Sequence, residues 1–415
     1  MCDGLLESEH PQEGEIRALQ DDNQGTEKGG ATMNCDLSKL RNSMQREGLD
    51  CIVVTTRQNV LYCTGHNVAT IDMAGRLTAV ILPLSGDPVF CLETNEAFEA
   101  KTWIKDVRVY KEGGEWEPLK PWEFVARVLE EKKLAKAKIG MEISMYSCAP
   151  AGIPAAHYNY LRKLLPDVEI VDCGHIFEKM RAVKTVEEIE IMEKAASISS
   201  EAIDTAFGAA KWGDTEQEIL FRMVTFCAER GFRVSHGYVD AGPNTFKTHH
   251  KTGDYRIKKG DMIHTDFGVL VQGYSADIAR AAKFGEPDAN EVKTYEFATE
   301  VMVKVAEMLV PGNTVMEVHN AAKKFYEDRG VEYKLVEDQG RDFIAHGLGL
   351  AVHEAPFIGP SHGNWVIEPG MIIAIEPRVT FGNARVHYED MFLVTTKGAK
   401  NFSCSRDFSK MMVIK

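Results

Sequence analysis

Residues 260–277 read GDMIHTDFGVLVQGYSAD, and this stretch has the pattern of a β-hairpin. The run from Met262 to Leu270 is rich in apolar and β-branched residues, and Val271-Gln272 is the predicted turn. With that turn, Asp266 faces Asp277 on the same side of the sheet. Facing carboxylates repel one another and need a partner if they are withdrawn from water. Taken alone, this pair is more simply interpreted as two solvated aspartates on a strand than as a binding site.

A second hairpin with the same feature lies further along the chain. Residues 371–377 read MIIAIEP, residues 386–394 read VHYEDMFLV, and Gly382-Asn383 between them is a favoured two-residue turn. This turn makes Glu376 face Glu389. Between the two hairpins lies His346, in the segment HGLG. Four carboxylates and one imidazole form a ligand set for two divalent cations, which can share bridging carboxylates when they are about 3.5–4 Å apart.

The composition narrows the class of protein. A chain of 415 residues is long enough for two domains with substantial cores. No apolar run approaches the roughly 18 residues that cross a bilayer, and the start of the chain lacks a secretion signal pattern. Nine scattered cysteines without a Cys-x-x-Cys pair favour a reducing compartment, so we expect a cytoplasmic protein. The net charge of −14 disfavours nucleic-acid binding.

Three segments can be distinguished along the chain. Residues 1–35 are acidic and short of large apolar side chains, which predicts a disordered extension, and Met33 within it is an alternative start. Residues 36–177 alternate helical and strand patterns and predict a compact α/β domain, with helices at 36–47, 121–133 and 155–165, strands at 51–55, 137–141 and 168–171, and a hairpin at 78–92. A second domain, residues 183–415, opens with a capping box at 185–188 that begins a long helix.

The second domain contains a faint internal repeat. Residues 213–219, GDTEQEI, match residues 312–318, GNTVMEV, and the match extends to the pairs Phe226/Phe325 and Arg230/Arg329. One ligand hairpin follows each copy. We therefore predict two pseudo-symmetric halves that close on a shared site.

These residues resemble the pita-bread metallopeptidases, the superfamily of methionine aminopeptidase, aminopeptidase P, prolidase and the metal-free creatinase. The resemblance covers residues 36–415 and implies an α+β fold, in which a smaller creatinase-like α/β domain precedes the pita-bread catalytic domain. The residues that match its ligand positions are Asp266 in TDFG, Asp277 in GYSAD, His346 in HGLG, Glu376 in IEP and Glu389 in YED. By this resemblance Asp277 and Glu389 bridge two ions, Asp266 holds one of them, and His346 with Glu376 holds the other. Creatinase lacks this set, so the fold alone does not establish the chemistry.

Two further histidines match substrate-facing positions of the superfamily. They are His249, upstream of Gly260, and His353 in the segment VHEAP. An imidazole at these positions can hydrogen-bond to the scissile carbonyl and stabilise its developing oxyanion. A polar loop is the alternative for His249, and His264 is expected to pack behind the metal site.

Some positions depart from the pattern of aminopeptidase P and prolidase. Those proteins usually carry a histidine four residues before the ligand histidine, where this chain has Asp342. They usually carry an arginine two residues before the last glutamate, where this chain has His387. Arg378 replaces the glycine usual after Glu-Pro, and Arg378 or Arg385 is a candidate replacement for the missing cation. These departures leave the metal chemistry intact and leave the Xaa-Pro specificity open.

The resemblance implies a dinuclear metal-dependent hydrolase that cleaves Xaa-Pro bonds in short peptides, of the aminopeptidase P or prolidase type. Glu376 is the expected proton acceptor, and His353 and His249 are expected to stabilise the oxyanion. Manganese, cobalt, zinc and iron all suit the site, with manganese or cobalt favoured. We expect a homodimer without nucleic-acid or membrane partners. The alternatives are a hydrolase of a small C–N compound, a metal-dependent lyase on the same site, and a non-catalytic binding module.

Overall fold

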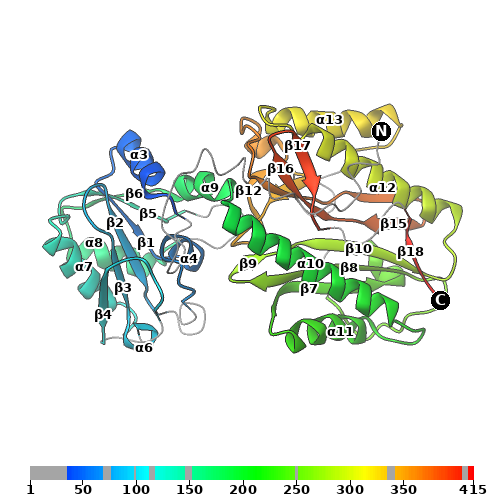
Figure 1. Ribbon diagram of the computed structural model, residues 1–415, viewed down its shortest axis with the longest axis horizontal. Coiled ribbons are helices and arrows are strands. Elements are labelled where there is room, and N and C mark those ends of the chain that lie inside the picture. Colours follow the sequence, from blue (N-terminus) through cyan, green and yellow to red (C-terminus); the bar gives the residue numbers. More distant parts are fainter. Residues whose placement is uncertain are drawn as a thin grey trace. The chain divides into compact units, whose positions relative to one another are not determined.

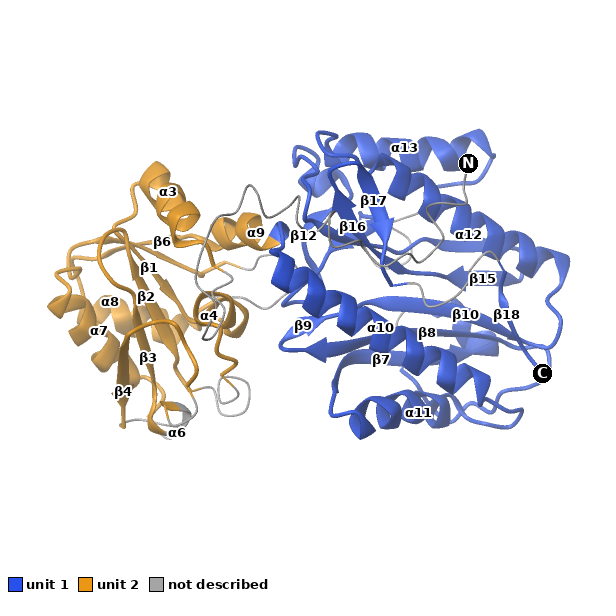
Figure 2. Ribbon diagram, in the orientation of Figure 1, with its two compact units in different colours: residues 1–24, 182–415 blue, residues 25–181 orange. Residues whose placement is uncertain are grey.

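The computed structural model describes residues 35–68, 76–97, 100–111, 117–144, 152–247, 251–333, 342–403 and 410–415 (Figure 1). The expected extension at 1–35 lies outside these residues except for Cys35, and His249 lies outside them too. The described residues form two compact units, one that ends at Arg181 and one that runs from Ala182 to Lys415 (Figure 2). All five expected metal ligands belong to the second unit.

The first unit is built on a six-stranded mixed sheet. Its elements are α3 (Leu37–Glu47), β1 (Cys51–Val54), α4 (Arg57–Thr64), β2 (Ala79–Pro83), β3 (Val89–Glu93), α6 (Thr94–Ala97), β4 (Asp106–Tyr110), α7 (Pro121–Glu131), β5 (Lys138–Met141), α8 (Ala155–Leu164), β6 (Glu169–Asp172) and α9 (Gly174–Ala182). The strand order is β4-β3-β2-β1-β5-β6, and the expected hairpin at 78–92 is the antiparallel pair β2–β3. Apolar side chains of these strands pack against α7 and α8 around the buried Trp122.

The second unit carries two larger sheets and a two-stranded ribbon. Its elements are α10 (Val186–Gly208), α11 (Glu216–Glu229), β7 (Arg233–Ala241), η1 (Gly242–Phe246), β8 (Met262–Val271), β9 (Tyr274–Ser275), β10 (Ile278–Phe284), α12 (Ala289–Met308), α13 (Val315–Asp328), β11 (Ala345–Gly347), β12 (Glu354–Phe357), η2 (Pro360–His362), β13 (Ile372–Ile375), β14 (Arg378–Phe381), β15 (Ala384–His387), β16 (Asp390–Thr395), β17 (Gly398–Asn401) and β18 (Met412–Ile414). One sheet has the order β18-β10-β8-β7 with β9 beside β8, the other has the order β12-β11-β13-β16-β17, and β14 pairs with β15. Helices α10 and α11 pack on the first sheet, and α12 and α13 cover the second sheet and the ribbon (Figure 1).

The internal repeat corresponds to two similar helix-and-sheet halves. Thr215 and Thr314 each begin a 14-residue helix with a complete capping box. At the other end of these helices the guanidinium groups of Arg230 and Arg329 lie over a phenylalanine of the preceding turn, 3.6 and 3.5 Å from the ring centre. Each half carries one of the two ligand hairpins, so the halves present their carboxylates to one another.

The first ligand hairpin is present, but its expected register is wrong by two residues. The turn is Gln272-Gly273, whose φ angles of 50° and 93° suit a two-residue hairpin loop. A β-branched valine in the expected turn would have needed an unfavourable positive φ. Asp266 therefore faces Ala279 and not Asp277. Because a shift of two residues preserves the face of a strand, both aspartates still lie on the same side of the sheet.

The second ligand hairpin forms about Gly382-Asn383 as predicted. One register relates the residue pairs on either side of the ligand position, which are Arg378–His387 and Ile375–Asp390. That register sets Glu376 opposite Glu389, which confirms the predicted pairing. The difference between the two hairpins is that Gly382-Asn383 has unambiguous turn chemistry, whereas residues 271–273 offer two turns.

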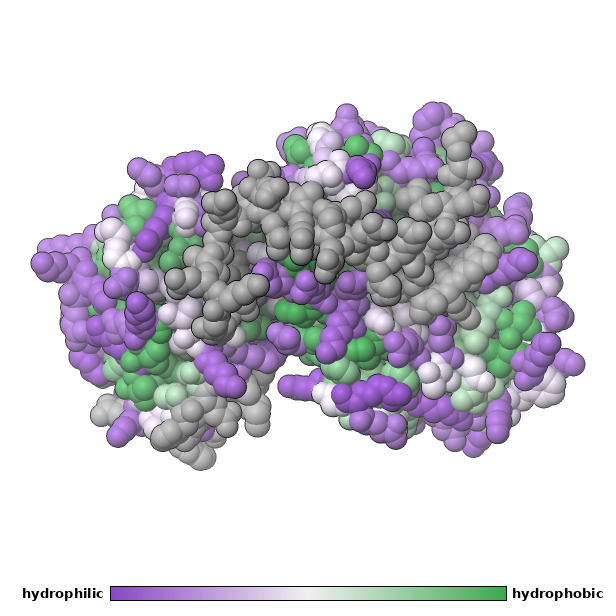
Figure 3. All heavy atoms as spheres, in the orientation of Figure 1, coloured by the Kyte–Doolittle hydropathy of each residue, from purple (hydrophilic) through white to green (hydrophobic). Residues whose placement is uncertain are grey.

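No helix of the described residues is both long enough and apolar enough to cross a bilayer. The face drawn in Figure 3 is mainly hydrophilic, with smaller apolar areas between the charged side chains. Trp212 and Phe221 are exposed apolar side chains of the second unit.

Candidate metal centre

The five expected ligands come from different strand ends and converge in the second unit. They are Asp266 on β8, Asp277 just before β10, His346 on β11, Glu376 just after β13 and Glu389 just before β16, and all five are buried. The Nε2 atom of His346 lies 3.7 Å from Oδ2 of Asp277 and 3.5 Å from Oε1 of both Glu376 and Glu389. The structure therefore brings one imidazole against carboxylates from both hairpins.

Two neighbouring strand pairings place Asp266 and Glu389 on either side of Ala279. Ala279 faces Asp266 on β8, and it joins the two sheets through a pair of backbone hydrogen bonds to Glu389, at 3.3 and 3.0 Å. Facing residues in a sheet share one side, so the methyl group of Ala279 lies between the two carboxylates. A larger side chain at Ala279 would occupy the space toward which the carboxylates point.

The buried carboxylates of this cluster repel one another. Burial raises the pKa of Asp277, and the adjacent charge of Asp266 raises it further, to about 7. Burial likewise raises the pKa of Glu389 well above its usual value, and the charge of Asp277 adds to this effect. The Oε1 atom of Glu389 is buried and makes no hydrogen bond to any residue that the structure describes. Oxygen-rich groups of this kind, with one imidazole, fit divalent cations.

A buried ion pair holds the backbone behind Glu389. Arg280 Nη2 lies 2.6 Å from Asp390 Oδ1, and Arg280 Nη1 donates a hydrogen bond of 2.6 Å to the carbonyl oxygen of Glu389. The hydroxyl of Tyr388 donates to the other oxygen of Asp390 at 3.0 Å. These contacts fix the strand end that presents Glu389, which is the usual role of groups just behind a metal ligand.

His353 lies beside the ligand histidine. The ring centres of His346 and His353 are 4.3 Å apart, and a ring nitrogen of His353 lies within 4.8 Å of ligand atoms of Asp277 and His346. His353 is partly exposed, so its ring can contact a molecule bound at the cluster. His264 is buried, with Nδ1 3.4 Å from Asp240 Oδ1, and within the described ranges it joins no candidate ligand group.

Arg378 and His387 face one another across the β14–β15 ribbon. Arg378 Nη2 lies 3.0 Å from Glu376 Oε2, while His387 Nε2 lies 3.7 Å from the same oxygen. Burial lowers the pKa of His387, and the charge of Arg378 contributes, so that the pKa is about 4 and the imidazole is neutral near pH 7. The resemblance implies an arginine at position 387. In this chain the positive charge is instead carried by Arg378, on the facing strand.

Arg385 and Asp342 are the two other positions considered from the sequence. Arg385 is buried and donates a hydrogen bond of 3.0 Å to the carbonyl oxygen of Phe246. Asp342 is partly buried, and among the described residues it belongs to no group that could hold an ion. Of the two arginines considered from the sequence, Arg378 is therefore the one that reaches the cluster.

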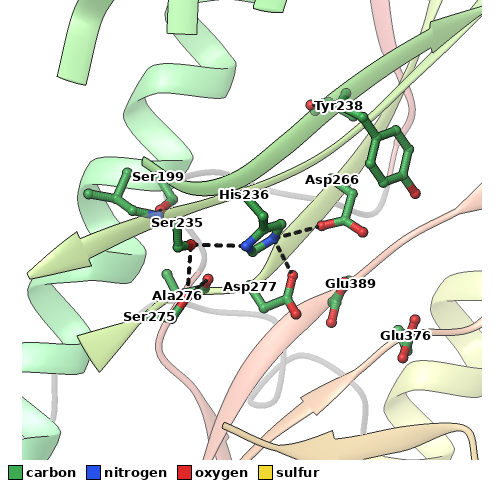
Figure 4. A network of polar contacts seen from close by, with 12 residues as sticks. Ser199, Ser235, His236, Tyr238, Asp266, Ser275, Ala276, Asp277, Glu376 and Glu389 are labelled. Atoms are coloured by element: carbon green, nitrogen blue, oxygen red, sulfur yellow. Dashed lines mark hydrogen bonds and ion pairs between the residues drawn. The ribbon is translucent and has the colours of Figure 1, made fainter. Parts of the chain in front are cut away.

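Sequence reasoning missed His236, which touches both aspartates of the first hairpin. Its Nε2 lies 3.1 Å from Asp266 Oδ1 and 3.0 Å from Asp277 Oδ1 (Figure 4). Burial lowers the pKa of His236, but the charges of Asp277 and Asp266 outweigh this effect and raise it to about 10. Although burial raises the pKa of Asp266, the hydrogen bond and charge of His236 bring it below its usual value. No motif marks His236 in the sequence.

Two family models match the chain. The Creatinase/Prolidase N-terminal domain matches residues 37–183, and Metallopeptidase family M24 matches residues 190–396. Together they span both compact units and all five expected ligands.

Curated relatives match over nearly their whole length. The Xaa-Pro dipeptidase of Lactobacillus delbrueckii subsp. lactis is 27% identical over 393 residues, which cover 92% of this chain and 100% of the relative. The Xaa-Pro dipeptidase of Pyrococcus horikoshii is 26% identical over 382 residues, which cover 89% of this chain and 97% of the relative.

Solved structures share the fold. The Xaa-Pro dipeptidase from Bacillus anthracis has a TM-score of 0.77 at 22% identity, and covers 91% of this chain and 99% of its own. The X-Pro aminopeptidase from Thermotoga maritima has a TM-score of 0.73 at 19% identity, with the same coverage. At these identities the likeness shows the pita-bread and creatinase-like architecture.

Proposed function

Because the chain belongs to metallopeptidase family M24, with a creatinase/prolidase-type N-terminal domain, we propose that it is a metal-dependent hydrolase that cleaves Xaa-Pro bonds in short peptides. The observation that carries the proposal is the approach of His346 to three buried carboxylates, at 3.5–3.7 Å. The names of the full-length relatives supply the substrate class. A peptide substrate and a divalent metal follow from this assignment.

In this proposal two divalent ions are held by Asp266, Asp277, His346, Glu376 and Glu389. Asp277 and Glu389 would be shared by both ions, as the resemblance implies, and each has a carboxylate oxygen near ligand atoms of other members of the set. The oxygen-rich set suits manganese or cobalt, and zinc and iron are also compatible with it. When bound, such ions acidify a water molecule and polarise the scissile carbonyl.

In this proposal, protein side chains transfer the proton and stabilise the negative charge that develops during the reaction. Glu376 accepts the proton of the attacking water and delivers it to the leaving amine nitrogen. Arg378, with Nη2 3.0 Å from Glu376 Oε2, holds this carboxylate in position. His353 donates a hydrogen bond to the oxyanion that develops on the former carbonyl oxygen. His249 is proposed for the same task.

Replacing His353 with alanine should lower kcat by roughly 10²–10³, the range for losing one oxyanion donor. Metal content should not change, because His353 is not one of the five proposed ligands. The measurements are steady-state kinetics and elemental analysis on the same preparation, with His175→Ala in the first unit as a control. Full activity of His353→Ala would show that this residue has another role.

A substrate panel tests the proposed specificity. We expect the manganese-loaded enzyme to cleave Xaa-Pro dipeptides or Xaa-Pro tripeptides and to leave the matching Xaa-Ala compounds intact. A metal-loaded enzyme that cleaves no proline compound would point to a hydrolase of a small C–N compound or a lyase. A protein that binds no metal would be a binding module.

If the enzyme is a dipeptidase, Arg378→Ala should weaken the binding of dipeptides more than the binding of tripeptides. A dipeptidase needs a cation for the free carboxylate next to the scissile bond, and Arg378 is the arginine nearest the ligands. Losing that charge-assisted contact should raise KM for Xaa-Pro dipeptides roughly tenfold or more. The tripeptides should show a much smaller change in KM. If the substitution acted only through Glu376, it would change kcat by the same factor for dipeptides and tripeptides. Equal changes in KM for the two substrate classes would contradict the anchoring role.

We also propose the domain limits 36–177 and 183–415, a cytoplasmic location and a homodimer. Among the described residues, six buried free cysteines support a reducing compartment: Cys35, Cys51, Cys63, Cys91, Cys173 and Cys227. Analytical ultracentrifugation of the full chain tests the dimer, for which a sedimenting mass of one chain would be the contrary result.

A further inference from the structure

His236 on β7 has the geometry of a metal ligand. Its Nε2 lies 3.1 and 3.0 Å from oxygens of Asp266 and Asp277, as Figure 4 shows. Adjacent ligand atoms about an octahedral ion, each about 2.1 Å from it, are separated by about 3.0 Å. The three side chains therefore have the spacing of three ligands around one cation.

A β-bulge directs His236 to this position. The pairing of β7 with β8 shifts by one residue between Val234 and His236, so Ser235 is the extra residue and His236 faces Gly268. Without the bulge, strand alternation would set His236 opposite Phe267 and on the other face of the sheet. Bulges of this kind re-aim side chains near functional sites.

Gly268 provides the space that the imidazole fills. A Cβ atom at Gly268 would lie 2.4 Å from Cε1 of His236 and 2.8 Å from Oγ of Ser235. Such distances are too short for any side chain at this position. The glycine that follows Asp266 by two residues in TDFG is thus required both by the carbonyl oxygen of Ala276, 2.1 Å from that Cβ position, and by the ring of His236.

A chain of hydrogen bonds behind the ring gives Nδ1 of His236 a partner. It runs from His236 Nδ1 to Ser235 Oγ at 2.9 Å, to Ser275 Oγ at 2.8 Å, and to the carbonyl oxygen of Ala276 at 2.9 Å. Ser275 Oγ donates to Ser235 Oγ, and the hydroxyl oxygen of Ser235 has a second lone pair that can accept from Nδ1–H of His236.

When the neutral ring carries its proton on Nδ1, its Nε2 atom has a lone pair that faces the two aspartates. The chain is also fixed at its far end, because the backbone N–H of Ser275 donates to the carbonyl oxygen of Gly349 at 2.7 Å. Gly349 ends the HGLG segment of His346. Both halves of the unit therefore hold the imidazole in place.

We propose that His236 is a further protein ligand of the metal centre and shares one ion with Asp266 and Asp277. This inference rests on the proposed metal centre and extends its ligand set. Each ion would then have one imidazole, from His236 on one side and His346 on the other. A second nitrogen donor favours cobalt, zinc or iron over manganese, which prefers oxygen ligands.

X-ray absorption spectroscopy of the cobalt-loaded full-length protein tests the proposal, because it counts imidazole ligands directly. Wild-type protein with two ions should show an average of one imidazole per ion, and His236→Phe should show about half that number for the same cobalt content. Cobalt affinity at one site should also fall by more than about 100-fold. A group that only orients ligands typically changes metal affinity 10–100-fold.

Ser235→Ala is the matched control, because it removes the hydrogen bond to Nδ1 and keeps the imidazole. It should leave the imidazole count unchanged, as should His175→Phe in the first unit. Circular dichroism checks folding, and His236→Gln supplies the same readout where the phenylalanine variant does not fold. Equal imidazole counts in wild type and both His236 variants would overturn the proposal. Wild-type protein that binds no cobalt would overturn the metal centre itself.

Discussion

Glu376→Gln is expected to lower kcat by at least about 10³, while the protein remains folded. Glu376 is buried, with Oε1 3.5 Å from His346 Nε2 and Oε2 3.0 Å from Arg378 Nη2. Glutamine has nearly the same size, so it leaves no cavity. It cannot accept the proton of the attacking water, however, and it removes a negative charge from beside Arg378.

The experiment compares kcat, metal content and the circular dichroism spectrum of the variant with those of wild type. Glu368→Gln is the control, because Glu368 is an exposed glutamate shortly before β13 and should leave the rate unchanged. Glu376→Asp keeps the charge but withdraws it, and should retain more activity than the glutamine variant. A glutamine variant with more than about a tenth of the wild-type rate would be inconsistent with proton transfer by Glu376.

The placement of two carboxylates on one face of each hairpin could be predicted because hairpin patterns are local, whereas the convergence of both hairpins on His346 followed from the resemblance. Alternation and turn chemistry place a carboxylate on a known face of a strand, and the register of the second hairpin follows from Gly382-Asn383 alone. In the first hairpin Gln272-Gly273 competes with the adjacent pair, and only the preference of glycine for positive φ decides between them. Because a register error of two residues does not change the face on which Asp266 lies, the predicted site was unaffected by the error.

His236 could not be predicted, because its position depends on a long-range pairing. A single histidine in a strand has two possible faces, and the bulge at Ser235 decides which face it takes. That bulge is visible only once β7 is paired with Gly268 on β8. The same limit applies to Arg378, whose relation to Glu376 depends on the β14–β15 ribbon.

Four elements of the first unit, α4, α6, β4 and α9, were missed, and the patterns of α4 and β4 show a different reason. Helix α4 is buried at six of its eight positions, from Asn59 to Thr64, so it has no polar face and no amphipathic period. Strand β4 is an edge strand whose apolar side chains Val107 and Val109 are exposed, while Asp106 turns toward Lys132. Helix α4 thus lacks the polar face of an amphipathic helix, and β4 reverses the usual rule that apolar side chains face the core.

Asp277→Asn is expected to reduce metal content from two ions per chain to one or fewer and to lower kcat by at least about 10³. The two carboxylate oxygens of Asp277 face different imidazoles, with Oδ1 3.0 Å from His236 Nε2 and Oδ2 3.7 Å from His346 Nε2. This placement supports the proposed bridging role of Asp277. Two divalent cations about 4 Å apart repel one another strongly, and an amide offers no negative charge to offset that repulsion.

Thermal unfolding distinguishes this loss of metal binding from a loss of folding. Wild-type Tm should rise when manganese or cobalt is added, because the ions bind the folded state, and the Asp277→Asn variant should show little rise. Without metal the variant should be at least as stable as wild type, because a neutral amide relieves the repulsion between Asp277 and Asp266 in the buried cluster. Asp240→Asn, close behind the ligands at His264, is the control and should keep both ions. A variant of Asp277 with two ions and an unchanged rate would exclude the bridging role, whereas a metal-free variant that unfolds far below wild type would show that Asp277 supports the fold rather than the ions.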